Sequence, residues 1–341
     1  MKKAILGVDM GHDRLKLVLM KGKKIMKTAT VQMPERLIQE GRVASVETMA
    51  ELIRKTMKAE GMRCSKAAWV IPNENIFVRN VKMPQMTPAQ LTYNLPFEFR
   101  DYITGESKDY VYDYAMLSDL QEMEEQRNSE EQDEEEDFAG PGMELMAVAV
   151  PSVLIEEAKQ IFRKSGMKLV MAAPAVCSYS ALIRQKGAED QQEYCILDIG
   201  YQAIRMYMFR GERHNVTRVL EIGLYQLDDA ISDAYNVDVH LAHTYLMTNY
   251  DNCQNKDVCL EVYQRIAVEL MRTLNFYRFS NPDSLLTDIW LCGGGVEIPA
   301  LQDAIKNVLD INIHSAKELV SGGEYMENNS MFVQAIGITQ N

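Results

Sequence analysis

The chain has 341 residues, of which 47% are hydrophobic and 25% charged, and its formal net charge is −13. These values are typical of a soluble globular protein with about two domains. The negative charge argues against binding to nucleic acid, because that affinity comes from clustered lysine and arginine. It also argues against a broad electrostatic contact with anionic lipid.

The first predicted element is a pair of strands in the stretch ILGVDMGHDRLKLVLMKG, which begins at Ile5. Asp9 stands at the end of the first strand, where a buried carboxylate is costly unless a partner satisfies it. Charged residues from Asp9 to Arg14 interrupt the apolar run too early for a signal peptide. Since no uncharged window is long enough for a membrane span, we expect a cytoplasmic protein without direct membrane insertion.

The next segment alternates helices and strands. Apolar spacing predicts a helix over 45–61. A capping box formed by Thr87 and Gln90 predicts a second helix, which should bend at Pro96. The acidic segment 118–142 separates two predicted strands, and we interpret it as a long solvated hairpin loop.

A second hairpin, YCILDIGYQAIRMYMFRG, repeats the spacing of the first one without a gap. The pairs that superpose are Asp9 with Asp198, Gly11 with Gly200, and Lys16 with Arg205. Two hairpins with the same internal spacing predict two similarly built halves. If the halves face each other, the two aspartates lie on opposite walls of one cleft.

This arrangement suits phosphate chemistry. A glycine beside each aspartate lets backbone N–H groups approach an anion, and paired carboxylates can hold Mg²⁺ through its waters between nucleotide phosphates. The alternative is that each aspartate only caps a tight hairpin.

Three glycines, Gly293, Gly294 and Gly295, follow a predicted strand in DIWLCGGGVEIPALQ, and Pro299 marks the start of a helix. They leave room for a flat ligand against the backbone, or they simply make a strand-to-helix turn.

The cysteines and histidines give no metal pattern. None of the six cysteines forms a CxxC pair, so we interpret them as buried, reduced thiols. His240 and His243 form the one close histidine pair, which we interpret as a solvated helix face.

In this order the elements resemble the actin-like ATPase superfamily, and within it the PilM family of type IV pilus assembly proteins, relatives of FtsA. The matching stretches are LGVDMG, RNVKMPQMTPAQLTYNLPFEFRDYI, CILDIG, VELMRTLNFYRF, WLCGGGVEIPAL and MFVQAIGIT. The resemblance implies an α/β fold of duplicated actin-like (ribonuclease H-like) domains with an inserted small α+β subdomain, called SHS2 or 1C. The implied division is a first half of 1–75, 173–192 and 311–341, an insertion of 76–172, and a second half of 193–310.

The resemblance also implies a site for ATP and Mg²⁺ between the halves, with no catalytic residue assigned. The implied roles are Asp9 and Asp198 toward Mg²⁺ through water, Lys16 toward the phosphates, Gly11 and Gly200 in the phosphate loops, Gly293 to Gly295 against adenosine, and Glu269 on the ribose.

Several positions depart from the family pattern. His12, Asp13 and Arg14 stand where relatives carry serine or threonine hydroxyls, and no glutamate stands near Ser178. The second loop departs as well, with Tyr201, Gln202 and Ala203, and Leu224 replaces a second glycine. These departures predict at most a slow ATPase, with nucleotide binding favoured over hydrolysis.

The implied function is an ATP-binding scaffold of a type IV pilus or type II-like secretion machine, held at the inner face of the cytoplasmic membrane by partners. The implied partner is the cytoplasmic N-terminal tail of a bitopic, PilN-like membrane protein, with the assembly ATPase as a second candidate. We expect the tail to dock at the seam between the first half and the insertion, near Phe77, Arg79 and Lys82.

Two alternatives remain at this point. An FtsA-like cell-division protein usually ends in an amphipathic membrane-targeting helix, which the closing MFVQAIGITQN does not provide. A sugar or acetate kinase of the superfamily needs a general base in its substrate cleft, and we find no polar constellation that fits.

Overall fold

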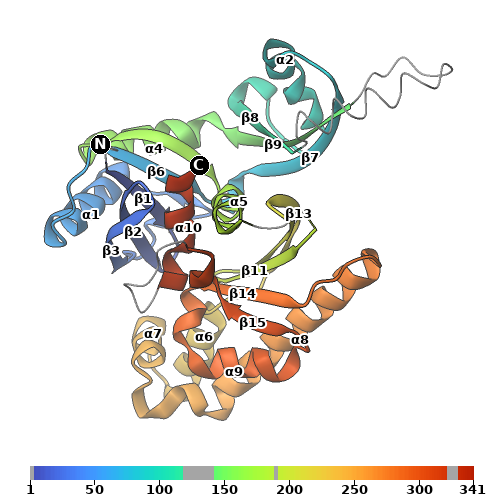
Figure 1. The fold of residues 1–341 in the computed structure, drawn as a ribbon. Helices are drawn as coiled ribbons and strands as arrows, with labels where there is room; N and C mark the ends of the chain where they lie inside the picture. The colour runs from blue at the N-terminus through green and yellow to red at the C-terminus, as the bar shows by residue number, and fades with distance from the viewer. Residues whose placement is uncertain (1–3, 118–141, 188–190, 321–328) are drawn as a thin grey trace.

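The computed structural model describes residues 4–117, 142–187, 191–320 and 329–341. All of the predicted acidic loop except Gly142 lies outside these ranges. Two five-stranded sheets and a smaller three-stranded sheet make up the fold (Figure 1).

The first sheet has the strand order β10 (Lys168–Pro174), β6 (Lys66–Ile71), β1 (Ile5–Met10), β2 (Arg14–Lys21) and β3 (Lys24–Gln32). Helices α1 (Val46–Ala59) and α4 (Ser152–Lys164) share one hydrophobic cluster with one face of this sheet. Helices α5 (Ala175–Lys186) and α10 (Val333–Gly337) pack on its other face. The final residues of the chain therefore help to bury its first strand.

The second sheet has the order β13 (Arg213–Leu220), β12 (Ile204–Arg210), β11 (Glu193–Ile199), β14 (Asp288–Gly293) and β15 (Asn312–Ser315). Its outer face packs on α6 (Tyr225–Tyr235), α7 (Val239–Thr248), α8 (Asp257–Ser280) and α9 (Pro299–Val308). Its inner face joins α5 and α10 in the core that both sheets share.

The predicted duplication is confirmed by the pairing of the strands. In each sheet three antiparallel strands are followed by two parallel ones. Asp9 lies opposite Lys16 in β1 and β2, and Asp198 lies opposite Arg205 in β11 and β12. The two hairpins therefore share one register.

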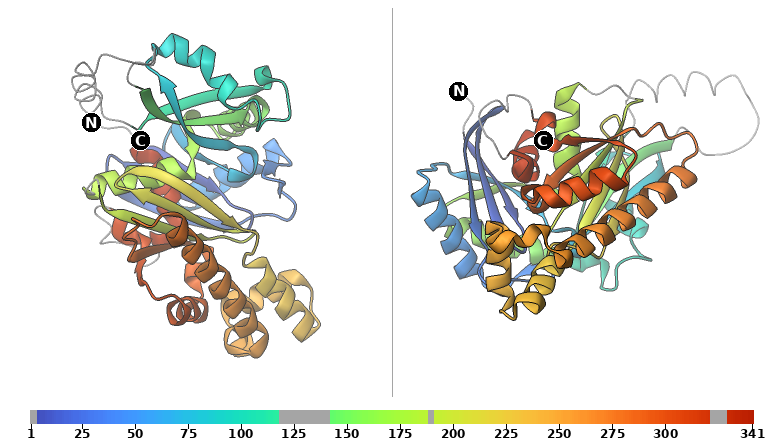
Figure 2. Two further views of the ribbon diagram at one scale, coloured as in Figure 1. Left: turned by 90° about the vertical axis from the view of Figure 1, so that its right-hand side faces the viewer. Right: turned by 90° about the horizontal axis from the view of Figure 1, so that it is seen from below.

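The inserted subdomain is a sheet of order β7 (Phe77–Pro84), β9 (Gly142–Pro151) and β8 (Tyr110–Met116). Helix α2 (Pro88–Glu98) covers one face, and the predicted capping box of Thr87 and Gln90 is present. Pro96 lies inside α2, which ends two residues later at Glu98. Figure 2 shows this subdomain at one end of the molecule and the helices of the second half at the other.

Strand pairing differs from the expected boundaries at two places. β10 pairs with β6, and α4 packs against α1, because their apolar residues complete the core of the first half. The sheet of the insertion therefore ends after β9, at residue 151 and not at 172. Similarly, β15 pairs with β14 and belongs to the second sheet.

Short elements complete the chain. They are β4 (Ile38–Gln39), β5 (Arg42–Val43), and the 3₁₀ turns Asn73–Asn75, Ser107–Asp109, Tyr250–Asn255, Gly294–Glu297, Ala316–Leu319, Asn329–Phe332 and Ile338–Gln340. All six cysteines are free thiols, four of them buried. Within the described ranges, no helix is both long enough and apolar enough to span a membrane.

Candidate functional site

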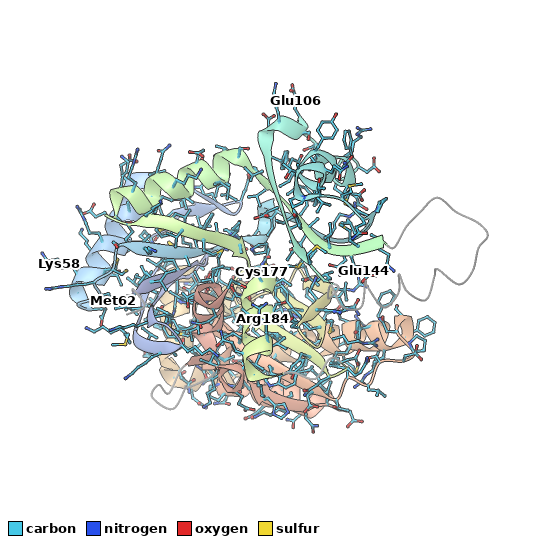
Figure 3. All side chains as sticks on the ribbon, turned by 45° about the horizontal axis from the view of Figure 1, so that its top comes forward. Lys58, Met62, Glu106, Glu144, Cys177 and Arg184 are labelled. Carbon is cyan, nitrogen blue, oxygen red and sulfur yellow. The ribbon has the colours of Figure 1, made fainter. Side chains whose placement is uncertain are left out.

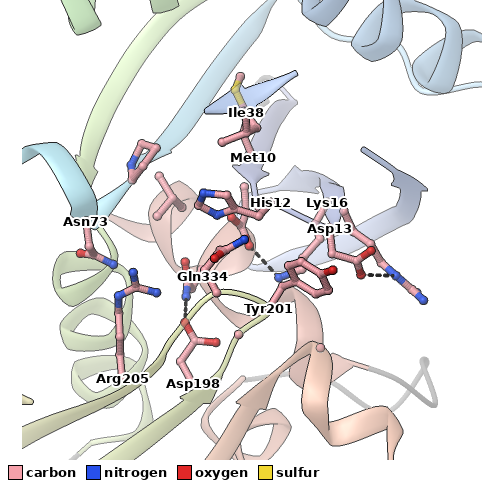
Figure 4. Close-up of a pocket in the computed structure, with 18 of the residues that line it drawn as sticks. Met10, His12, Asp13, Lys16, Ile38, Asn73, Asp198, Tyr201, Arg205 and Gln334 are labelled. Atoms are coloured by element: carbon pink, nitrogen blue, oxygen red, sulfur yellow. Dashed lines mark hydrogen bonds and ion pairs between the residues drawn. The ribbon is translucent and has the colours of Figure 1, made fainter. Parts of the chain in front are cut away.

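A cleft of about 100 Å³ lies between the halves, where the turns of the two hairpins meet (Figure 4). The predicted site residues that line it are Asp9, Gly11, Lys16, Asp198, Gly200 and Gly294. Both aspartates are buried, at 9% and 7% exposure. The equal register of the hairpins thus brings the paired carboxylates to one place.

Asp9 and Lys16 form a direct ion pair. The Lys16 Nζ donates to Asp9 Oδ2 at 2.9 Å, across the β1–β2 ladder. Burial favours the neutral amine, but the charges of Asp9 and Asp198 outweigh it and raise the pKa of Lys16. A protonated lysine therefore lies close to both carboxylates.

Asp198 has a neutral partner. Gln334, on α10, donates from Nε2 to Asp198 Oδ2 at 2.7 Å and to the Tyr179 hydroxyl at 2.9 Å. Burial raises the pKa of Asp198, against the opposing charges of Lys16 and Arg205. Sequence reasoning missed Gln334, although its position as the one polar residue between Met331 and Ile338 was a signal.

Arg205 is the counterpart of Lys16, but it pairs across the cleft. Its Nη2 donates to Glu74 Oε1 at 2.7 Å. Glu74 lies in the turn that follows β6 in the first half. Asn73, in the same turn, donates to the hydroxyl of Tyr207 at 2.9 Å. The turn at 73–75 is thus bonded to β12 of the other half.

His243 does not lie on a solvated helix face, contrary to the sequence interpretation. Its Nε2 is 3.2 Å from Asp13 Oδ1 and its Nδ1 is 2.9 Å from Asp228 Oδ2. Burial opposes its charged form, but the hydrogen bonds and charges of the two carboxylates raise the pKa of His243 to about 9. The ring is therefore an imidazolium at neutral pH.

The glycine run is divided between the cleft and the core. Gly294 lines the cleft. Gly293 has φ +88°, and a Cβ there would overlap Asp198 Oδ1 and lie 2.5 Å from the Ile199 carbonyl oxygen. Gly295 packs against the Ile199 side chain. The close approach of β14 to the end of β11 thus explains two of the three glycines without a ligand.

Glu269 does not join the site. Its carboxylate accepts from Arg272 Nη1 at 2.5 Å on α8, with the side chain 46% exposed, and it is not among the residues that line the cleft. The structure therefore gives no support to the expected ribose contact.

The three expected partner-binding residues differ in availability. Phe77 is half-buried, with its ring 6.4 Å from that of Tyr110. Arg79 donates to the carbonyl of Glu98 and lies 4.0 Å above the Tyr102 ring, so it holds the insertion together. Lys82 is 83% exposed and pairs with Glu144, which Figure 3 labels on β9. Of the three, only Lys82 is open to a partner.

The donor set suits a hydrated divalent cation beside phosphates. Two carboxylates from opposite walls can hold Mg²⁺ through water, and Lys16 lies between them. Among the described residues, no group of three or more His, Cys, Asp or Glu forms a metal cage. A second pocket of about 480 Å³ shares His12, Asp13, Ile38 and Tyr201 with this cleft, so the open space at the seam extends beyond the paired carboxylates.

A family model described as type IV pilus assembly protein PilM matches residues 7–328. Among solved structures, a PilM-PilN type IV pilus biogenesis complex matches at TM-score 0.81 and 21% identity, over 98% of this chain and 97% of that chain. The ethanolamine utilization protein EutJ from Carboxydothermus hydrogenoformans matches at TM-score 0.60 and 14% identity, over 99% and 89%.

MreB5 of Spiroplasma citri bound to AMPPNP matches at TM-score 0.52 and 11% identity, over 99% of this chain and 96% of that chain. At such identities the likeness shows the fold, which is the expected actin-like α/β fold. No curated protein matches the chain in sequence.

Proposed function

We propose that this chain, which belongs to the PilM family of type IV pilus assembly proteins, is a scaffold that binds Mg-ATP between its halves and docks the cytoplasmic tail of a membrane protein. The observation that carries the nucleotide part is the pair Asp9 and Asp198. They occupy equivalent positions of two hairpins and face one cleft beside Lys16. The family favours a pilus machine over cell division or a sugar kinase.

In this proposal Asp9 and Asp198 hold the waters of Mg²⁺, and Lys16 faces the phosphates. The MreB5 neighbour is bound to AMPPNP, which supports nucleotide binding by a chain of this fold. Gln334 positions Asp198, because its amide holds one carboxylate oxygen. The adjoining pocket of about 480 Å³, which shares Asp13 and Tyr201 with the cleft, offers space for the rest of the nucleotide.

Calorimetric titration with Mg-ATP tests the site. Asp9→Ala and Asp198→Ala should each weaken binding about tenfold or more, since each removes a charge-assisted contact worth about 1.5–3 kcal/mol. Glu269→Ala is a matched control, because this carboxylate lies on α8 and does not line the cleft. Equal losses in all three variants, or no binding by the parent protein, would overturn the site.

We also propose that hydrolysis is slow or absent. The basis is the departure from the family pattern, since His12, Asp13 and Arg14 stand where relatives carry hydroxyl groups and no glutamate stands near Ser178. Phosphoryl transfer to water needs a group that positions the nucleophile. A phosphate-release assay checks this, and a turnover near one per second, the low end of ordinary enzymes, would contradict it.

The proposed dock for the partner's tail is the seam between the insertion and the first half. β8 is an edge strand of the inserted sheet. Val111 on β8 is 46% exposed, and Val153 at the start of α4 is 48% exposed. Val111 pairs with Val150, three residues before Val153, so the two side chains lie at the same end of β9. An extended peptide with apolar side chains can add to such an edge.

A binding assay with a synthetic tail peptide of the PilN-like partner tests the dock. Val111→Asp and Val153→Asp should each reduce binding about tenfold, because a buried carboxylate would lack a partner. Lys82→Glu, on the opposite edge strand β7, is the control for the seam and the test of the position expected from the sequence. Loss of peptide binding only in Lys82→Glu would indicate that the tail binds at β7.

A further inference from the structure

The loop between β1 and β2 connects the two halves of the molecule through charged side chains. Asp13 ends this loop and Arg14 begins β2, and both residues contact the second half. These are two of the positions where the family resemblance leads one to expect hydroxyl groups. Charges have replaced them, and the charges have partners on the opposite wall.

Five side chains form a chain of alternating charge, in the order Asp228, His243, Asp13, Arg14 and Glu297. The successive distances are 2.9 Å, 3.2 Å, 3.1 Å and 3.1 Å. The two ends come from α6 and from the turn before α9, while the two residues from the first half lie between them. The chain can be complete only while the halves lie together.

We infer that these five residues act as an ionic latch, which holds the two halves together beside the cleft and must break before the halves can move apart. The latch itself is independent of the ligand, while its regulatory meaning rests on the proposed binding of Mg-ATP.

Burial makes this latch stronger than surface ion pairs. Asp228 is fully buried, and the other four side chains are 12–21% exposed. Exposed pairs contribute little because water screens them. A buried carboxylate without its cation is costly, and Asp228 Oδ1 already lacks a hydrogen-bond partner among the described residues. His243 therefore stays paired with Asp228, and its positive charge neutralises the buried carboxylate.

The groups around His243 keep it charged. Asp13 faces it from the β1–β2 loop and Asp228 faces it from α6. The ring of Tyr201, from the loop after β11, lies 6.0 Å away. His240, one turn earlier on α7, is occupied by Glu35 at 2.9 Å. Two facing carboxylates outweigh burial and raise the pKa of His243 to about 9, so the latch is charged at neutral pH.

The latch also lies at the cleft. Asp13 and Arg14 both line it, and the Arg205–Glu74 pair bonds its far wall. A nucleotide that Asp9 and Asp198 hold from opposite walls binds better while the halves lie together. A ligand shifts such an equilibrium only by its differential affinity for the two states. Weakening the latch should therefore weaken nucleotide binding.

Hydrogen–deuterium exchange of the full chain without nucleotide tests the latch. In His243→Gln and in Asp13→Asn, the amides of 11–14 and 73–75 should exchange about tenfold faster than in the parent, since the open state becomes more populated. His240→Gln is the matched control, because its ion pair with Glu35 is exposed and lies outside the chain of charges. Exchange equal to the parent in both latch variants would overturn the inference.

Two variants are needed because His243→Gln leaves Asp228 without its cation and can disturb α6. Asp13→Asn removes the contact from the first half while His243 and Asp228 stay paired. Titration with Mg-ATP then separates the two proposals. Faster exchange with weaker binding in Asp13→Asn supports both. Faster exchange with no binding in any variant supports the latch and overturns the nucleotide site.

Discussion

The hairpins β1–β2 and β11–β12 have the same register, yet their charged residues have different partners. Asp9 is paired with Lys16, which lies opposite it in the same ladder. Asp198 is held by an amide from α10, while its counterpart cation Arg205 reaches the other half. The backbone of the hairpin is thus reproduced, but the elements packed around each copy decide what each carboxylate contacts.

Gly7 and Ile196 occupy the same position of the two hairpins and show this difference most clearly. Gly7 faces α10 so closely that a Cβ would overlap the carbonyl of Ala335. Ile196 has room for a full side chain in the core shared by the sheets.

The largest expected effect comes from Gly7→Ala. We expect it to lower the free energy of unfolding by about 3 kcal/mol. The new Cβ would overlap the backbone carbonyl of Ala335, which cannot move away as the end of a flexible side chain can. Ile196→Val should lower it by about 1 kcal/mol, since one methyl group is lost from a packed core. Urea unfolding of both variants checks this, and equal losses would show that α10 adapts.

A second test exchanges each aspartate for asparagine in buffer with EDTA. Asp9→Asn should lower the free energy of unfolding by about 2 kcal/mol, because Lys16 loses its ion pair. Asp198→Asn should raise it or leave it unchanged at pH 7, because burial disfavours the ionised carboxylate and raises its pKa. Equal losses of stability would mean that Lys16 stabilises the two carboxylates to the same extent.

The smallest effect concerns the ion pairs between the halves. A double-mutant cycle of Glu74→Gln and Arg205→Gln should give a coupling of about 1 kcal/mol, since the two side chains are only 29% and 13% exposed. The same cycle for Glu35 and His240, at 66% and 62% exposure, should give about 0.3 kcal/mol or less. Equal couplings would show that burial does not distinguish the two pairs.

Repeated local patterns made the fold and the two aspartates predictable. The Asp-x-Gly spacing of each hairpin is a local signal, and it recurs without a gap. The partners were not predictable in the same way, because Gln334 and Glu74 reach the cleft, and His243 reaches Asp13, from distant parts of the chain. A single polar residue has no periodicity, and only the packing of a helix or turn determines what it faces.

The glycine run shows a second limit of prediction from the sequence. Its pattern of strand, three glycines and helix was correct, with β14 ending at Gly293 and α9 beginning at Pro299. The pattern could not distinguish a glycine beside a ligand from one that allows two strands to approach. That distinction depends on Asp198 and Ile199, which precede the run by more than ninety residues.

The position of α10 has a consequence for synthesis on the ribosome. Residues 333–337 are made after both sheets, and they cover Gly7 in the first strand. The second sheet, with all of its strands within 193–315, can therefore assemble while the first still lacks its cover. Closure of the first half joins residues more than 300 positions apart, and contacts of such separation form late in folding. The amino-terminal strand is thus the first part of the chain to emerge and among the last to be buried.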